Sequence, residues 1–291
     1  MKFKKGVLIF NPAAGKFYNF SYLKKIIEYF GSLGVEIILK KTFEPADIRR
    51  KTEEGLKEGV DFIGALGGDG TIREVGSILV ETGIPMLIIP FGTSNVLAYS
   101  LNISLNPLKA ARLFEKGKIQ NIDCGIANGE YFFFIASTGI DAKVMKSQNI
   151  HFKKIFGRLS FYPSLIKNIL LYDFPKIKIE GEGLKSDGFY TAVSNVPYFA
   201  GKFKLFQDAS PFDGFLDLIV LKEKGIKNYI KYFIELQKEE IYKSSSAEVK
   251  KIKEIEITSK SQVPYQLDGD SKGNLPLKIL IKERALSLFL P

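Results

Sequence analysis

The first 122 residues alternate strictly between short apolar runs and segments whose apolar residues recur at helical spacing. This alternation is typical of a parallel sheet, because two parallel strands must be joined by a crossover, usually a helix, that packs on a face of the sheet. We therefore predict an α/β domain over residues 1–123, an open parallel sheet with helices on both faces. The pattern predicts strands at 6–10, 35–41, 60–66, 84–89 and about 119–126, and helices at 21–33, 45–58, 71–82, 94–101 and 107–116.

The pattern changes after residue 123. Asn128-Gly129 stands between apolar runs, which is a strong hairpin signal, and later segments alternate apolar and charged residues as half-buried strands do. We therefore predict an antiparallel β-rich sandwich domain over residues 124–291, whose extreme C-terminus is a candidate to return to the first domain. Strands are expected at 175–180, 189–195, 215–221, 250–258, 263–267, 275–282 and 285–290, and helices at 150–172 and about 226–239.

A glycine-rich run, Gly67-Gly68-Asp69-Gly70-Thr71, lies at the junction between the third strand and the helix that follows it. Glycines at such a junction let the backbone approach a ligand closely, and the bare N–H groups of a helix start attract phosphate. An acid between the glycines needs a mediator to meet phosphate, so Asp69 indicates Mg²⁺ or its waters. The alternative is a tight turn in which Asp69 caps the helix.

Two further loops follow strands in the same way, Asn11-Pro12-Ala13-Ala14-Gly15-Lys16 and Pro90-Phe91-Gly92-Thr93-Ser94-Asn95. Because ligands bind at the carboxyl ends of the strands in an open parallel sheet, we expect the three loops to converge on one crevice. Asn11, Thr93 and Asn95 supply neutral donors that suit an anion or a ribose. The loops are neither a P-loop nor a Rossmann fingerprint, since the sequence lacks Gly-Lys-Ser/Thr and the required glycine spacing.

Composition excludes several kinds of chemistry. With one Cys and one His, the chain has no credible zinc cluster, and it lacks the Gly-x-Ser-x-Gly elbow of a serine hydrolase. No apolar stretch approaches the ~20 residues that span a bilayer, so we expect a cytoplasmic protein. The formal net charge of +10 admits nucleic acid, an anionic membrane or a polyanionic ligand.

The segment 150–174 combines clustered basic residues with many Phe, Tyr, Leu and Ile residues. Such a segment fits the anionic inner face of a membrane, which predicts peripheral attachment there. An ordinary amphipathic helix packed on a sheet explains the segment equally well. No helix-turn-helix, zinc-finger or RNP pattern occurs, so no nucleic-acid partner is expected.

The three loops resemble the catalytic domain of the diacylglycerol kinase family, which includes bacterial lipid kinases and the sphingosine and ceramide kinases. The resemblance rests on Asn-Pro-x-x-Gly-Lys, Gly-Gly-Asp-Gly-Thr and Gly-Thr-x-Asn in this order, and it continues at Ser194-Asn195, at 208–217 and at Leu267-Asp268-Gly269-Asp270. It therefore covers nearly the whole chain. Gly-Gly-Asp-Gly-Thr alone is shared with NAD kinases and phosphofructokinases, whose N-terminal fold the resemblance implies here.

The resemblance implies an ATP- and Mg²⁺-dependent lipid kinase that transfers the γ-phosphate to a hydroxyl of diacylglycerol or a related membrane lipid, as in phospholipid biosynthesis. The alternatives are a sphingoid-type lipid kinase, an NAD kinase, and an inactive lipid- or nucleotide-binding regulator. Besides the lipid and the membrane, the partner considered is a second copy in a homodimer. The implied nucleotide-binding residues are Asn11, Pro12, Gly15, Thr42, Gly67, Gly68, Asp69, Gly70, Thr71, Glu74, Gly92, Thr93 and Asn95.

The resemblance also assigns acids. Asp69 and Asp123 are implied in the catalytic Mg²⁺ network, although Val96 stands where many bacterial members have a third acid. Asp268 is the implied general base, and Asp270 replaces a usual Glu, which leaves open which of the two accepts the proton. The alternative for this Asp-Gly pair is an ordinary hairpin turn.

Two assignments by resemblance concern smaller sites. Asp213 resembles the side-chain ligand of a structural Mg²⁺ in some bacterial members, with the carbonyl groups of Ser210 and Phe215 completing that site. Thr42 matches a Thr that the family has after its second strand, and it fits the N-cap region of the next helix equally well.

Overall fold

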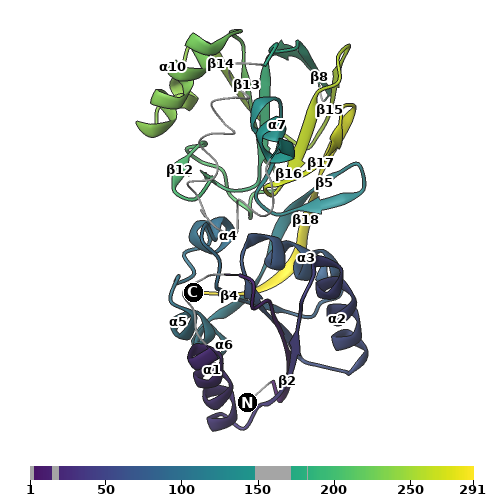
Figure 1. Ribbon diagram of the computed structural model, residues 1–291, viewed down its shortest axis with the longest axis vertical. Helices are drawn as coiled ribbons and strands as arrows, with labels where there is room; N and C mark the ends of the chain where they lie inside the picture. Colours follow the sequence, from purple (N-terminus) through teal and green to yellow (C-terminus); the bar gives the residue numbers. More distant parts are fainter. Residues whose placement is uncertain (1–2, 15–19, 148–171, 182) are drawn as a thin grey trace. The chain divides into compact units, whose positions relative to one another are not determined.

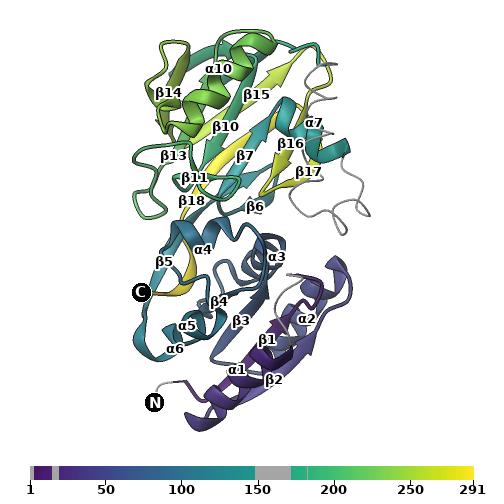
Figure 2. The same cartoon turned by 60° about the vertical axis from the view of Figure 1, so that its left-hand side comes forward.

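The computed structural model describes residues 3–14, 20–147, 172–181 and 183–291 (Figures 1 and 2). The chain divides into two compact units. Unit 1 consists of Met1–Cys124, Ala200–Lys202 and Glu283–Pro291, and unit 2 consists of Gly125–Phe199 and Phe203–Lys282. The C-terminal residues are therefore part of the N-terminal unit.

Unit 1 is built on a parallel sheet in the order β2-β1-β3-β4, with the end of β18 added beside β4. Residues of β1, β3 and β4 are almost all buried, because helices cover both faces of the sheet. The elements are β1 (Lys5–Phe10), α1 (Phe20–Ser32), β2 (Glu36–Lys41), α2 (Pro45–Lys57), β3 (Phe62–Gly67), α3 (Asp69–Leu79), β4 (Met86–Pro90), α4 (Val96–Ser100), α5 (Pro107–Ala111), α6 (Leu113–Lys116) and β5 (Lys118–Ala127), which continues into unit 2.

The helices of unit 1 lie in two layers. Helices α1 and α5 contact each other on one side of the sheet, and α2 and α3 contact each other on the opposite side (Figure 1). This placement of helices on both faces follows from right-handed crossover connections. The chain moves from β1 to β2 in one direction across the sheet and then to β3 and β4 in the other direction, so the connecting helices fall on opposite faces. The predicted fold class is confirmed, with one local difference: the helix expected at 107–116 is divided into α5 and α6 at Arg112.

Unit 2 is a sandwich of two antiparallel layers. One layer has the strand order β14-β13-β10-β7-β16-β17, and the other runs β18-β15-β8-β9. The apolar core between the layers takes Leu218 and Val220 from the first and Ile179, Ile257 and Ile279 from the second. The elements are β6 (Glu130–Phe132), β7 (Ile135–Thr138), α7 (Ile140–Ser147), β8 (Ile177–Gly181), β9 (Leu184–Gly188), β10 (Tyr190–Ser194), β11 (Tyr198–Phe199), β12 (Phe203–Lys204), β13 (Leu216–Leu221), α10 (Ile226–Gln237), a 3-10 turn (Ile241–Lys243), β14 (Ala247–Ile252), β15 (Glu254–Ser259), β16 (Pro264–Leu267), β17 (Asp270–Asn274) and β18 (Leu277–Leu290).

Three predictions for this half require comment. The strand expected at 250–258 is two strands, because the chain leaves one layer after β14 and enters the other with β15. The strands expected at 275–282 and 285–290 are one strand, β18, which continues through Arg284 at a φ of 51°. The helical segment expected at 150–172 lies, apart from its last residue, outside the described residues.

Candidate active site

The loops after β3 and β4 meet through their backbones. Gly67 ends β3 and Gly68 is the N-cap residue of α3. A Cβ atom on Gly92 would lie 2.5 Å from the Cα of Gly68, and one on Gly67 would lie 2.4 Å from the side chain of Thr71. Any side chain at these glycines would push the two loops apart or displace the first turn of α3.

The side chain of Asn95 closes the loop after β4. Its Oδ1 accepts a hydrogen bond from the N–H of Gly92 at 3.0 Å, and its Nδ2 donates to the carbonyl of Gly92 at 2.8 Å. Asn95 is buried, and its backbone is in the left-handed helical region with a φ of 48°. Asn tolerates this backbone region better than most residues, so Asn95 shapes the loop that precedes α4.

The loop after β1 joins the same edge of the sheet. The N–H of Asn11 donates to the carbonyl of Leu66 at 3.0 Å, and its Nδ2 donates to Thr71 Oγ1 at 3.1 Å. Thr42, which follows β2, is buried and donates its hydroxyl to the carbonyl of Phe10 at 3.3 Å. The structure thus brings together the segments that follow all four parallel strands. Gly15, which was predicted to belong to the same site, lies outside the described residues.

Asp69 is the first residue of α3, and its Oδ1 atom is buried without a hydrogen-bond partner among the described residues. Burial raises the pKa of Asp69 to about 6, against the lowering effect of the N–H groups of Val96, Leu97 and Asn95. A buried carboxylate oxygen with no protein partner fits a Mg²⁺ ligand, since kinase sites hold this ion by one or two carboxylates together with substrate phosphates. No larger cluster of Asp, Glu, His or Cys suited to a metal occurs in the described parts of the chain.

The other predicted nucleotide and metal residues occupy varied positions. Asp123 is buried, and its Oδ1 accepts a hydrogen bond from the N–H of Arg284 at 2.7 Å, which ties β5 to the C-terminal part of β18. Glu74 pairs with the buried Arg73 at 2.7 Å. The residues that remain exposed at the loops are Pro12, Gly70 and Thr93.

Asp268 and Gly269 form the two-residue turn between β16 and β17, with φ angles of 50° and 86°. The side chain of Asp268 is buried, and its carboxylate accepts three backbone N–H groups: Oδ2 from Phe133 at 2.8 Å, and Oδ1 from Phe134 at 3.0 Å and Ile135 at 2.9 Å. Such charge-assisted bonds lock the turn against the start of β7. Asp270, two residues further on, is exposed.

A buried polar network that the sequence did not reveal supports this turn. Gln266 accepts the N–H of Gly269 at 2.7 Å through Oε1 and donates to Ser137 Oγ at 2.7 Å through Nε2. Ser137 and Tyr190 in turn donate to Asp141 Oδ2, the latter at 3.3 Å. Burial raises the pKa of Asp141 to about 6. The network passes through side chains of β7, β10, β16 and α7, which only the folded chain brings together.

Comparison with known proteins agrees with both units. Residues 5–127 match the model of the diacylglycerol kinase catalytic domain, and residues 135–290 match the YegS C-terminal NAD kinase beta sandwich-like domain. A Streptococcus pneumoniae protein named as a candidate lipid kinase is 30% identical over 98% of both chains. The chain belongs to the diacylglycerol kinase family.

Further relatives in the diacylglycerol kinase family match over nearly their whole length. A diacylglycerol kinase of Bacillus subtilis is 27% identical, covering 99% of this chain and 97% of its own. A crystal structure of a candidate diacylglycerol kinase from Bacillus anthracis superposes with a TM-score of 0.85 at 26% identity, covering 100% of this chain and 96% of its own. The described helices include none that is long and apolar enough to cross a bilayer.

Asp213, the acid expected at a structural Mg²⁺ site, pairs with a lysine in this structure. Asp213 Oδ1 accepts the N–H of Phe215 at 3.0 Å, and Oδ2 pairs with Lys251 Nζ at 2.6 Å. Lys251 stands opposite Asp217 in the pairing of β13 with β14, and its Nζ lies 3.5 Å from that carboxylate. The lysine ammonium is therefore shared by the two carboxylates, and the sequence did not reveal this contact because it depends on strand register.

Thermal unfolding tests this difference. Because Lys251 supplies the positive charge at Asp213, we expect Mg²⁺ to leave the Tm of the nucleotide-free Asp69→Asn variant unchanged. The variant Lys251→Met leaves Asp217 buried without its partner, so its Tm should fall by roughly 2–6 °C and should recover in part on adding Mg²⁺. The matched variant Lys251→Met/Asp213→Asn should lose that recovery. A Tm of the Asp69→Asn variant that rises with Mg²⁺ while Lys251 is present would show that an ion does bind at Asp213.

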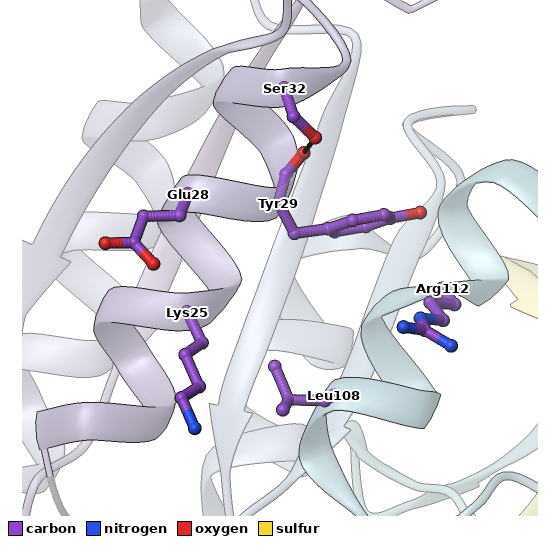
Figure 3. A pocket seen from close by; sticks show the side chains of 6 residues that line it. All are labelled: Lys25, Glu28, Tyr29, Ser32, Leu108 and Arg112. Carbon is purple, nitrogen blue, oxygen red and sulfur yellow. Dashed lines mark hydrogen bonds between the residues drawn. The ribbon is translucent and has the colours of Figure 1, made fainter.

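A shallow hollow of unit 1 lies away from these loops, between α1 and α5 (Figure 3). It is lined by Tyr29 and charged side chains of α1, by Leu108 of α5 and by Arg112 directly after α5. The Tyr29 hydroxyl donates to Glu115 at 3.3 Å, and burial together with this carboxylate raises the pKa of Tyr29 to about 12. None of its lining residues is among the predicted site residues, so the hollow does not enter the catalytic argument.

Proposed function

We propose that the chain is an ATP- and Mg²⁺-dependent kinase that transfers the γ-phosphoryl group to a hydroxyl of diacylglycerol or a related membrane lipid. The observation that carries the proposal is the buried Asp69 oxygen without a hydrogen-bond partner among the described residues, at the point where the loops after β3 and β4 touch. The proposal is further supported by family membership and by the diacylglycerol kinase names of several relatives.

The nucleotide is proposed to bind over the four loops of unit 1. The exposed Gly70 has nothing within 4 Å of the position of a Cβ, so phosphate groups could approach the backbone of this turn, where the first N–H groups of α3 are free of helical partners. Asn11 and Asn95 hold these loops in place. Asp69, with Asp123 as the second acid, would hold the Mg²⁺, which neutralises charge on the transferred phosphoryl group.

The proton of the lipid hydroxyl is proposed to go to Asp270. The support is a contrast within one turn: Asp270 is exposed, whereas the carboxylate of Asp268 is buried and already accepts three N–H groups. A general base must reach the proton it removes within hydrogen-bond distance, directly or through one water. Asp268 is then the residue that fixes the direction of the turn.

Contact with an anionic membrane surface at the cytoplasmic face is part of the proposal, since the acceptor is a lipid. The net charge of +10 supports attraction to such a surface. The basic aromatic segment 150–174 that suggested this contact lies, up to residue 171, outside the described residues.

Transfer of labelled γ-phosphate from ATP tests the proposed function. The protein is incubated with Mg²⁺ and mixed micelles that contain diacylglycerol, a sphingoid base or ceramide, and in parallel with NAD⁺. We expect label in a chloroform-soluble product from one of the lipids and none in NADP⁺. Label in NADP⁺ would establish an NAD kinase, and no transfer to any acceptor would leave a binding protein without kinase activity.

A further inference from the structure

Helix α10 lies on the outside of unit 2 (Figures 1 and 2). Its outward face is apolar. Phe233 is 47% exposed and Ile230 is 54% exposed, and Ile226 and Ile234 are exposed as well. At 100° per residue these four side chains fall within an arc of about 100°, so they form one continuous stripe. Isolated exposed apolar residues are common, but a stripe of four along one helix marks an interaction surface.

The opposite side of α10 is fixed to the protein. Tyr232 and Leu236 are buried, and the Tyr232 hydroxyl donates to the carbonyl of Ser246 at 3.1 Å and accepts the N–H of Glu223 at 3.2 Å. The ring of Tyr229 contacts Phe174 at 5.0 Å. Because the inner side is held by specific contacts, the apolar stripe keeps its outward direction.

Lysines line one edge of the stripe. Lys227, Lys231 and Lys238 fall in the next ~60° of the helical wheel beyond Ile234, and all three are exposed. Lys231 is engaged within the protein, since its Nζ lies 3.9 Å from Glu223 and 4.0 Å from Glu235. It also donates to Ser246 Oγ at 3.1 Å. Lys227 and Lys238 form no ion pair within the described parts of the chain. An apolar stripe edged by lysines is the arrangement of helices that lie in the plane of a membrane interface.

We infer that the outer face of α10 docks on an anionic lipid surface. The inference rests on the proposed function, because a kinase whose acceptor remains in a bilayer has to work at that surface. Each lysine near anionic lipid adds to the attraction, and the four apolar side chains enter the boundary between head groups and acyl chains. An antiparallel symmetric pair of copies through this stripe is less suitable, since it would bring the Lys227 and Lys238 edges of the two copies together.

Sedimentation with sucrose-loaded vesicles tests the inference without ATP. On phosphatidylcholine vesicles that contain phosphatidylglycerol, we expect Phe233→Ser to lower the partition coefficient by about tenfold. Phe212→Ser is the matched control, because Phe212 is 51% exposed on a different segment of the same unit, and it should bind as the wild type does. Lys227→Gln/Lys238→Gln should lower binding by roughly 10- to 30-fold on these vesicles and leave binding to pure phosphatidylcholine unchanged.

Two results would overturn the inference. The first is wild-type vesicle binding by Phe233→Ser together with Ile230→Ser. The second is that light scattering finds a dimer for the wild type and a monomer for Phe233→Ser, while the variant still binds vesicles. The stripe would then be an interface between copies of the chain. Activity on a short-chain diacylglycerol dispersed in water separates the two proposals: if no phosphoryl transfer occurs but α10 variants lose vesicle binding, docking stands and the kinase proposal fails.

Discussion

Replacing Asp69 by Asn should lower kcat by several orders of magnitude while the protein remains folded. Asn keeps the size of the side chain but removes the charge that would hold Mg²⁺ on the nucleotide phosphates, and groups of this kind contribute through the transition state. The Asp69 Oδ1 has no hydrogen-bond partner among the described residues, so placing the amide NH2 there breaks no hydrogen bond within the described parts of the chain. Steady-state rates on mixed micelles with saturating ATP measure the loss.

The same variant should be more stable than the wild type at neutral pH. The pKa of Asp69 is raised to about 6 in the folded protein, so its favourable contribution is complete below the unfolded value of 3.8 and is lost as the pH rises through about 6. At about pH 7.5 the ionised, buried carboxylate lowers the free energy of unfolding by roughly 1–3 kcal/mol. A neutral Asn side chain avoids this cost. The Tm of Asp69→Asn should exceed that of the wild type at this pH with chelator present, and the difference should vanish near pH 4.

Glu53→Gln on the surface of α2 is the matched control for these measurements, since it removes one exposed carboxylate from the same unit. It should change neither kcat nor the pH dependence of Tm. If Asp69→Asn retains more than about a tenth of the wild-type kcat, Asp69 is not a metal ligand in the reaction.

The parallel half of the fold could be read from the sequence because its strands are buried on both faces. Such strands appear as continuous apolar runs, as in β3 and β4, and the helices between them carry a separate period. The division of this helix at Arg112 was not predictable in this way. The helical spacing of apolar residues continues across Arg112, whereas the helical hydrogen bonding of the backbone is interrupted there.

The antiparallel half was harder to read because alternation gives the period of a strand but not its partner. Val249, Ile252, Ile255 and Ile257 recur among charged residues without a turn signal between them, yet β14 pairs with β13 and β15 pairs with β18 and β8 in the other layer. The contact of Lys251 with Asp217 has the same origin, since only the register of β13 and β14 places them opposite. Glycine-rich loops can be recognised from the sequence, because close approach of two backbones requires glycine at the contact positions.

The environment of Asp268 shows a further limit of sequence reasoning. Its carboxylate is held by backbone N–H groups of residues more than 130 positions earlier in the chain. Every non-proline residue has such a group, so a cluster of them has no sequence signature. The Asp-Gly pair predicted a turn and the family resemblance implied a base, and the proposed division of these roles between Asp268 and Asp270 rests on the burial of Asp268.

Replacing Asp270 by Asn should lower kcat by about 10²–10⁴-fold with little change in Tm or in the KM for ATP. Asp270 is exposed at the first position of β17, so the substitution removes a proton acceptor without disturbing the core. Asp268→Asn should act differently, because its NH2 group would face either the N–H of Phe133 or the N–H groups of Phe134 and Ile135, depending on which oxygen it replaces. Leaving such buried donors unsatisfied costs about 1–3 kcal/mol, so the Tm should fall.

Measuring kcat and Tm on both variants therefore separates a base from a structural carboxylate within one turn. The proposed roles require the large rate loss without a change in Tm at Asp270, and the fall in Tm at Asp268. If Asp268→Asn keeps its Tm and loses its rate while Asp270→Asn remains active, the roles are exchanged. If both variants turn over at nearly the wild-type rate, neither carboxylate takes the proton, because the loss of a general base costs far more than the scatter of such measurements.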